Sequence, residues 1–404
     1  MTSTAMNQRN PEEKSVYRSG KNKPHVVVAN IMRREGGTGL QTHSRMFISF
    51  LESYQYPCTL VTPYDAPLWQ VYPVFGMRKL IEPFNSSAGV WWHDHWHAHF
   101  LEAALRKHLR RNQDCVVYAQ CPPSACAALK ARQSPAQRVV MAVHFNRSQA
   151  DEWVDKGMIL RGGRVCKAIV DREREVLLQL DGLVFVSEFM RRELLSRHPG
   201  LGRIPYVVIP NFIPDPGLQA TASIDADLIS IGTLEPRKNQ GYLLDVIAAA
   251  HAHGTALRLT IVGDGPDRAT LESKARKLRI AHLVRFAGFV GNAAQMLSRH
   301  RAYVHAARLE NMPLTLIEAL SRSLPVFAPA VGGIPEIFDD GVEGRFLPLD
   351  NANNAALTIL EWLRSPQQMK QAAMAARSRF LSRFQSPEAA IRLAEFITSV
   401  GSQP

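Results

Sequence analysis

The sequence lacks three features that would mark a membrane-spanning, secreted or metal-binding protein. No apolar stretch reaches the roughly 18 residues that a membrane-spanning helix needs. Residues 1–23 are polar and contain no apolar segment typical of a signal peptide, so we expect a disordered N-terminal arm. The five cysteines show none of the paired spacings of zinc sites or redox motifs, and we expect reduced thiols in a cytoplasmic protein.

Acidic residues are the scarcer charge. The chain has 48 Lys and Arg against 36 Asp and Glu, a formal net charge of +12. Residues 1–214 hold ten of these excess positive charges, and residues 215–404 hold two. A basic half indicates either an anionic partner, such as a nucleic acid, a phospholipid surface or a phosphorylated substrate, or a solvated surface without a partner. Charge alone leaves these alternatives open.

Apolar segments rich in Val, Ile and Leu alternate with helical patterns in both halves of the chain. Such strands are apolar on both faces, which is typical of a parallel sheet covered by crossover helices. The sequence therefore predicts an α/β fold with two Rossmann-like domains that face each other across a cleft. The expected strands are 25–30, 58–62, 115–119, 139–144, 183–187, 206–210, 227–231, 257–262, 284–287, 302–306 and 325–328. The expected helices include 40–53, 97–110, 165–180, 367–384 and 387–400.

A segment rich in Pro, Gly, Ala and Asp separates the two halves and is expected to be a linker, residues 211–226. Residues 24–210 would form the first domain and residues 227–385 the second. A C-terminal helix within residues 386–404 is expected to pack back on the first domain. Because open α/β sheets bind ligands beyond the carboxyl ends of their strands, the loops there are the candidates for chemistry.

Several of these loops are rich in glycine or basic residues. Residues 33–40 (RREGGTGL) open a helix whose N-terminus suits an anion, but the spacing matches neither a dinucleotide nor an ATP motif. In residues 231–239 (IGTLEPRKN), Arg237 and Lys238 are placed to straddle a diphosphate. The segments VGDGP, FAGFV and AVGGIPE are further glycine-rich strand ends. Taken singly, each is also typical of an ordinary turn or a solvated surface.

Residues 308–320 (RLENMPLTLIEAL) place Glu310 in a loop and Glu318 in a helix that begins near Pro313. Two carboxylates so placed can contact two parts of one ligand in the cleft. On spacing alone, a pair of ordinary surface glutamates is the simpler interpretation.

In their order and spacing, the motifs G-x-L-x-P-R-K-N, VGDGP, F-x-G-x-V, E-x7-E and GGIPEI resemble those of the retaining family 4 glycosyltransferases. The motifs span residues 231–344, and the strand pattern together with Asn211 extends the resemblance from residue 24 to the end. The resemblance implies the GT-B fold, with two facing Rossmann-like domains. It also implies transfer of a sugar from a nucleoside-diphosphate sugar, with retention of configuration, and makes the first domain the acceptor side.

The resemblance assigns donor-side roles by position. The donor diphosphate would contact Arg237, Lys238, Gly332, Gly333 and Gly37, the last flanked by Gly36 and Gly39. The ribose and nucleoside would contact Glu318 and Gly288. The expected catalytic residues are Glu310, which would bind the hydroxyls of the donor sugar, and His144, at the end of an expected strand.

Two positions depart from the family pattern. Thr233 stands where the family often has an arginine, and Arg237 is the expected substitute. Glu310 is followed by Asn311, Met312 and Pro313, where the family usually reads E-G-F-G.

Residues 91–100 (WWHDHWHAHF) stand out by their alternating histidines. On a strand these would share one face, whereas on a helix His95 and His99 would pair. Metal binding lacks supporting Cys or Glu ligands. The remaining alternatives are local packing and an acceptor platform formed by His95, His97 and His99.

The sequence thus predicts a hexosyltransferase that uses a UDP- or GDP-linked sugar, GDP-mannose among them. Its acceptor would be a glycan or a lipid-linked glycan in polysaccharide or lipopolysaccharide biosynthesis. No metal and no cofactor besides the nucleotide-sugar substrate is expected, since Asp225-Ala-Asp227 precedes its strand and basic residues would stabilise the leaving diphosphate. The basic first domain fits a cytoplasmic protein peripheral to the anionic inner face of the membrane. The alternatives are a GT-B sugar-nucleotide epimerase, a phosphorylase of the same fold, and a nucleic-acid-binding protein, for which no recognition motif is evident.

Overall fold

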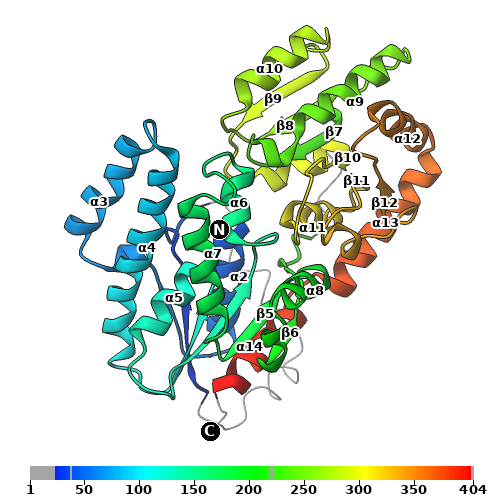
Figure 1. Cartoon of the computed structure of the whole chain (residues 1–404). Coiled ribbons are helices and arrows are strands. Elements are labelled where there is room, and N and C mark those ends of the chain that lie inside the picture. The colour runs from blue at the N-terminus through cyan, green and yellow to red at the C-terminus, as the bar shows by residue number, and fades with distance from the viewer. Residues whose placement is uncertain (1–22, 37–38, 218–222, 402–404) are drawn as a thin grey trace.

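The computed structural model describes residues 23–36, 39–217 and 223–401. They form two domains, each built on one sheet of six strands (Figure 1). All strand pairs in both sheets are parallel. The predicted α/β fold with two Rossmann-like domains is therefore confirmed. Most of the expected N-terminal arm (residues 1–22) and Gly37 lie outside the described residues.

The first sheet has the strand order β2-β1-β3-β4-β5-β6. Its central strands are rich in valine and buried on both faces, which is why they form a parallel sheet between helices. The strands are β1 (His25–Ala29), β2 (Cys58–Val61), β3 (Cys115–Ala119), β4 (Arg138–Val143), β5 (Gly182–Phe185) and β6 (Tyr206–Val208). The helices are α2 (Gly39–Ser53), α3 (Leu68–Ile81), α4 (Ser86–Leu109), α5 (Pro122–Ala131), α6 (Gln149–Asp155), α7 (Arg164–Leu177) and α8 (Glu188–Arg197).

The second sheet has the strand order β12-β11-β10-β7-β8-β9. Its strands are β7 (Ala226–Ile231), β8 (Leu259–Val262), β9 (Val284–Gly288), β10 (His300–Val304), β11 (Val326–Ala328) and β12 (Gly344–Phe346). Its helices are α9 (Gln240–Ala252), α10 (Arg268–Lys277), α11 (Leu314–Ser321), α12 (Ala352–Arg364) and α13 (Pro366–Arg383). Because β7 and β10 are neighbours, the loops that follow them leave the sheet side by side.

The last helix, α14 (Glu388–Gly401), packs on the first sheet although it follows the second domain in the chain (Figure 1). Its buried Ile397 shares an apolar cluster with Val26 and Val116 of the first sheet. A Cβ at Gly401 would lie 2.5 Å from a methyl group of Val116, so the close approach requires glycine. The chain therefore crosses between the domains twice.

The expected strands agree with the observed ones within two residues at each end. The helix expected at 97–110 begins earlier, at Ser86, because Asn85 caps it by accepting a hydrogen bond from Ala88 N at 2.9 Å. Helix α3 and the edge strand β12 were not predicted. None of the helices in the described ranges is long and apolar enough to cross a membrane. The five cysteines, all of them described, form no disulfide.

Candidate functional site

The loops after β7 and β10 bring Arg237, Lys238 and Glu310 together. Lys238 ends the short helix η3 (Pro236–Lys238) and donates a hydrogen bond from Nζ to Oε1 of Glu310. Nη1 of Arg237 lies 3.5 Å from Oε2 of the same carboxylate. The side chains are only 15%, 17% and 8% exposed, respectively, so the three residues form a buried ion cluster.

Glu310 is ionised in this cluster. Burial alone would raise the pKa of its carboxyl, but Lys238, His305 and Arg237 together hold that pKa well below its ordinary value. Nε2 of His305 lies 3.3 Å from Oε1 of Glu310, and burial lowers the pKa of His305. Since an ionised carboxylate only accepts hydrogen bonds, Glu310 suits the hydroxyl groups of a sugar.

The turn after β7 is what points both cations inward. Asn239 follows η3 with a left-handed φ of 55°, and its Nδ2 donates a hydrogen bond to the carbonyl of Ala306 at 3.1 Å. Nη2 of Arg237 donates to Oε1 of Glu235 at 2.9 Å. The backbone of this loop is thus tied to the segment after β10, and Arg237 and Lys238 face Glu310 instead of the solvent.

Gly332 and Gly333 pack on the backbone of the Glu310 loop. A Cβ at Gly332, which has a φ of +58°, would lie 2.0 Å from the carbonyl oxygen of Glu310. A Cβ at Gly333 would lie 1.8 Å from the carbonyl oxygen of Asn311. The N–H of Gly333 donates to the carbonyl of Glu310 at 2.9 Å. The N–H of Gly333 is thus bonded within the protein, and the contact of Gly332 and Gly333 with the donor diphosphate stays a prediction.

Asn311 connects the loop after β10 to the first domain. Its Nδ2 donates hydrogen bonds to the carbonyls of Val143, at 3.1 Å, and Phe145, at 3.0 Å. Its Oδ1 accepts a hydrogen bond from the hydroxyl of Ser187. The two carbonyls flank His144, so one buried amide fixes the second domain to the end of β4 at the expected catalytic histidine.

His144 lies beside His43 of α2, with the two ring centroids 4.8 Å apart. Burial, and then the neighbouring His43, hold the pKa of His144 well below its ordinary value, so the ring is neutral at pH 7. Within the part of the chain that the structure describes, its Nε2 is buried and has no hydrogen-bond partner. A neutral imidazole nitrogen left unpaired is free to bond a ligand, and leaving it unpaired costs free energy otherwise.

Glu318 lies inside α11 and is not among the ion-pair partners of Arg237 or Lys238 within the described ranges. Burial raises the pKa of its carboxyl to about 7, against the opposing effect of Arg322. A buried carboxyl that is half protonated near neutral pH is a candidate for contact with ligand hydroxyls.

The raised pKa of Glu318 predicts a pH-dependent loss of stability. Because the folded pKa of about 7 exceeds the ordinary 4.5, the stability contributed by Glu318 is complete below pH 4.5 and is lost as the pH rises through 7. We expect Glu318→Gln to be more stable than the wild type at pH 8, by on the order of 1–3 kcal/mol, and this gain to shrink below pH 5. Urea unfolding at both pH values measures it, with the exposed Glu361→Gln as control. Equal stability of Glu318→Gln and the wild type at pH 8 would contradict the prediction.

The three histidines expected on the acceptor side all lie on helix α4, but on two different faces of it. His95 and His99 are exposed and stack on one face, with centroids 6.5 Å apart. His97 is buried instead, stacked on Phe75 of α3 at 3.9 Å, with Nδ1 2.7 Å from the carbonyl of His93. Burial lowers the pKa of His97 to about 4. His97 therefore packs α3 against α4 and does not share the exposed face of His95 and His99, and the acceptor role expected of the three stays a prediction.

Gly288 ends the edge strand β9 with a φ of +70°, and its carbonyl accepts a hydrogen bond from the N–H of Gly263 at 2.8 Å. Its place at the carboxyl end of a strand fits the expected nucleoside side of the sheet, and its contact with the nucleoside remains a prediction.

The Asp-x-Asp pair was expected before its strand, but β7 begins at Ala226, so Asp227 lies within the strand and only Asp225 precedes it. Both carboxylates pair with arginines. Asp225 accepts from Arg299 at 2.7 Å and Asp227 lies 3.2 Å from Arg301. Over residues 23–36, 39–217 and 223–401, no group of three or more His, Cys, Asp or Glu side chains is arranged to hold a metal ion.

Several functional candidates escaped the sequence analysis. His305 and Asn311 contact the cluster or anchor it, and Glu152 of α6 faces it from the first domain. Burial raises the pKa of Glu152, and among the charges that act on its carboxyl are Arg237 and Glu310. In the sequence, His305 stands at the end of an expected strand and Asn311 departs from the family pattern, whereas Glu152 carries no such signal.

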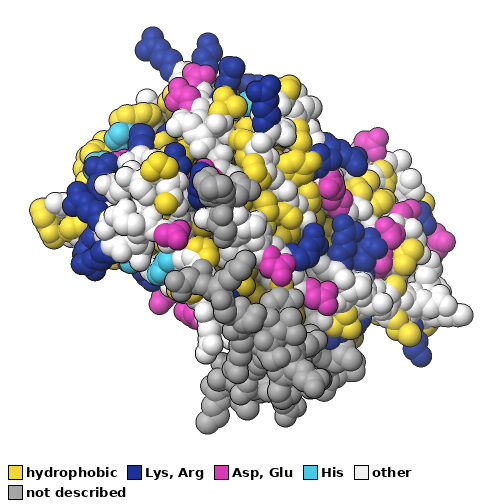
Figure 2. Space-filling view, turned by 90° about the horizontal axis from the view of Figure 1, so that it is seen from below, with side chains coloured by type: hydrophobic (Ala, Val, Ile, Leu, Met, Phe, Trp, Pro, Cys, Tyr) yellow, Lys and Arg dark blue, Asp and Glu magenta, His cyan; other side chains and the backbone are white. Residues whose placement is uncertain are grey.

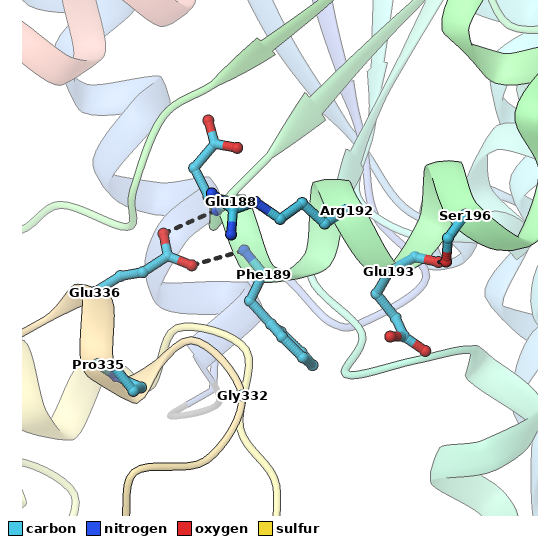
Figure 3. Close-up of a pocket in the computed structure, with 8 residues that line it drawn as sticks. All are labelled: Glu188, Phe189, Arg192, Glu193, Ser196, Gly332, Pro335 and Glu336. Carbon is cyan, nitrogen blue, oxygen red and sulfur yellow. Dashed lines mark hydrogen bonds between the residues drawn. The ribbon is translucent and has the colours of Figure 1, made fainter.

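A cavity of about 490 Å³ lies between the domains where the loop of Gly332 meets α8 (Figure 3). The carboxylate of Glu336 points at the first turn of α8 and accepts hydrogen bonds from the N–H groups of Glu188, at 2.8 Å, and Phe189, at 2.7 Å. A carboxylate of the second domain thus caps a helix of the first. This contact joins the two domains, and the Glu336 carboxylate occupies the N-terminus of α8, where an anion could otherwise bind.

Two family models divide the chain at the boundary between its domains. "Glycosyltransferase Family 4" matches residues 37–215, and "Glycosyl transferases group 1" matches residues 220–379. The chain belongs to the family 4 glycosyltransferases. The solved structures agree in fold: sucrose-phosphate synthase from Thermosynechococcus elongatus is 15% identical, with a TM-score of 0.72 over 94% of this chain and 99% of that one. Anabaena Alr3699/HepE in complex with UDP-glucose is 16% identical, with a TM-score of 0.67 over 93% and 99%.

Among curated glycosyltransferase-related proteins, the Vi polysaccharide biosynthesis protein VipC/TviE of Salmonella typhi is 29% identical over 143 residues, 35% of this chain and 25% of that protein. The matches span between 25% and 55% of the length of the curated relatives. This family 4 member is therefore similar to parts of those proteins, and their individual activities are not carried over to it.

Proposed function

We propose that this glycosyltransferase moves a hexosyl group from a nucleoside-diphosphate sugar to a glycan or lipid-linked acceptor, with retention of configuration, in the biosynthesis of a polysaccharide. The reaction breaks the bond between the anomeric carbon and the donor phosphate. It forms a bond from that carbon to an acceptor hydroxyl, whose proton passes to the leaving phosphate. Negative charge therefore develops on the diphosphate.

The ion cluster of Glu310, Lys238 and Arg237 carries this proposal. Two largely buried cations lie beside a carboxylate that is ionised and accepts hydrogen bonds. On donor binding, Lys238 and Arg237 stabilise the charge that develops on the diphosphate, while Glu310 orients the sugar through its hydroxyls. The unpaired Nε2 of His144, held at the domain interface by Asn311, bonds the sugar from the other side.

The comparisons support the class of donor and of pathway. The structure of HepE was solved with UDP-glucose, and the VipC/TviE protein is named for the biosynthesis of a polysaccharide. Neither supplies the base, the sugar or the acceptor used by this protein, so UDP is the first nucleotide to test and GDP the second.

A thermal shift measurement tests the donor site. A ligand that binds only the folded state raises the melting temperature by mass action. At one hundred times its Kd it adds about 2.7 kcal/mol to the free energy of unfolding. We expect one of UDP, GDP and ADP, or a sugar conjugate of it, to raise the melting temperature, with no change on addition of EDTA. We expect Lys238→Ala to remove most of this shift.

Two results would contradict the proposal. If no nucleotide raises the melting temperature, the proposed donor site is wrong. A shift that EDTA abolishes would show that the basic cluster does not bind the donor without a metal ion. Lys274→Ala is the matched control, because Lys274 forms a surface ion pair with Asp245 of the same domain at 2.7 Å.

A further inference from the structure

Helix α3 exposes an apolar surface that the proposed reaction does not use. The large side chains of this surface, which we call the α3 face, are Leu68 (46% exposed), Trp69 (76%), Tyr72 (52%), Leu80 (64%) and, just after the helix, Phe84 (93%). A surface helix of a soluble domain ordinarily turns polar residues outward. Contiguous exposed apolar residues instead indicate an interaction surface.

The opposite side of α3 already supplies its anchorage to the protein. Val71 is fully buried, Phe75 stacks on His97, and the indole Nε1 of Trp92 donates to the carbonyl of Val74 at 2.7 Å. At about 100° per residue, the α3 face covers the other half of the helix. Lys79 is the one charged residue of α3 in that half. The exposed apolar residues therefore do not serve the core.

Two basic residues lie beside the α3 face. Lys79 is exposed on it, and the guanidinium of Arg33 lies 5.2 Å from the ring of Tyr64, whose centroid is 6.3 Å from that of Tyr72. Two acids close to α3 are paired with arginines: Glu82 with Arg78 at 2.6 Å, and Asp65 with Arg34 at 2.7 Å. In Figure 2, hydrophobic and basic side chains lie next to each other at the edge of the molecule where Figure 1 places α3.

This combination identifies the occupant. Tryptophan, tyrosine and phenylalanine with flanking lysine and arginine are the residues that enter the interface of a bilayer, where the rings lie among the headgroups and the cations attract anionic lipids. A second protein surface would not need the excess of positive charge that the first half of the chain carries. We propose that the α3 face, with Arg33 and Lys79, binds the surface of a membrane that contains anionic phospholipids.

The position of the surface relates it to the cleft. Arg33 belongs to the segment after β1 that leads into α2, and a Cβ at Gly39, the first residue of α2, would lie 3.6 Å from Leu314 of α11 in the second domain. The segment of Arg33 thus leads from the side of the α3 face to a helix that starts near the second domain, while α3 itself lies at the outer edge of the first domain (Figure 1). In combination with the proposed function, on which this step rests, the bound membrane presents a lipid-linked acceptor to the cleft.

Sedimentation with vesicles tests the binding. We expect the wild type to sediment with vesicles of phosphatidylglycerol and phosphatidylcholine at low salt, and much less with phosphatidylcholine alone. The triple variant Trp69→Ser, Leu80→Ser, Phe84→Ser should bind at least about tenfold more weakly, because it removes three apolar side chains from the contact with lipid. Lys79→Glu should weaken binding mainly at low salt. The control is Leu160→Ser with Met374→Ser, which removes exposed apolar residues elsewhere.

The outcomes separate this inference from the proposed function. The proposed membrane site is wrong if the wild type does not sediment with anionic vesicles. It is also wrong if the triple variant binds them as well as the control variant does. A wild-type dimer that becomes monomeric in the triple variant, as measured by light scattering without vesicles, assigns the α3 face to a second copy and also overturns it. The nucleotide-induced thermal shift should be the same in the triple variant and the wild type. The thermal shift therefore tests the donor site separately from membrane binding.

Discussion

Replacing Lys238 by alanine is expected to lower kcat/KM by about 100-fold, the largest effect of any single change in the second domain. Removing one preorganised donor from a developing anion typically costs two to three orders of magnitude in rate. The Nζ of Lys238 is bonded to Glu310 in a cluster that is largely removed from solvent, so water is poorly placed to replace its charge. Initial rates of sugar transfer, measured with the nucleotide found by thermal shift, test the prediction.

The partner variant distinguishes loss of chemistry from loss of structure. Glu310→Gln keeps the volume but removes the carboxylate that Lys238 bonds and leaves Arg237 paired with Glu235, so we expect loss of activity together with a lower melting temperature. Lys238→Ala removes one cation and leaves Arg237 beside the carboxylate, and should therefore perturb the fold less. Lys274→Ala should retain wild-type rates. Near-wild-type kcat/KM in both Lys238→Ala and Glu310→Gln would show that the cluster is not part of the active site.

The fold was predictable because it depends on patterns that short segments carry. Valine-rich strands such as Val26–Val28 are buried on both faces whatever follows them, and the break after Asn211 is visible in composition alone. Helix α3 was missed for the opposite reason. Its residues are apolar on the exposed side as well as the buried one, and they include Pro73, so neither a helical period nor a start signal stands out.

The candidate site was only partly predictable, because its contacts join segments far apart in the chain. The resemblance placed Arg237, Lys238 and Glu310, and their meeting follows from the neighbouring parallel strands β7 and β10. Nothing local shows that the N–H of Gly333 is bonded to the Glu310 carbonyl, or that His97 turns into the packing of α3. Those outcomes depend on which residues a loop or helix meets after folding.

Asn311 is the clearest case, and its replacement by glycine is the second large effect that we expect. Glycine is the residue that the family usually has at this position, yet here it would remove the hydrogen bonds that Asn311 donates to the carbonyls of Val143 and Phe145 and the one that it accepts from Ser187. Each unsatisfied buried polar group costs about 1–3 kcal/mol. We expect Asn311→Gly to lower the free energy of unfolding by about 2 kcal/mol or more, and to lower kcat at least about tenfold through misplacement of His144.

The relative size of the loss of stability and the loss of kcat shows whether Asn311 positions His144 or only joins the domains. If it only ties the domains together, Glu336→Gln, which weakens the cap on α8, should reproduce the loss of stability and of activity in the same proportion. If it positions His144, Asn311→Gly should lose more activity than Glu336→Gln at equal loss of stability, with the loss in kcat and not in the KM for the donor. Asn353→Ala, at the exposed contact with His253, is the matched control. Wild-type kcat in Asn311→Gly would show that the amide between the domains does not act through His144.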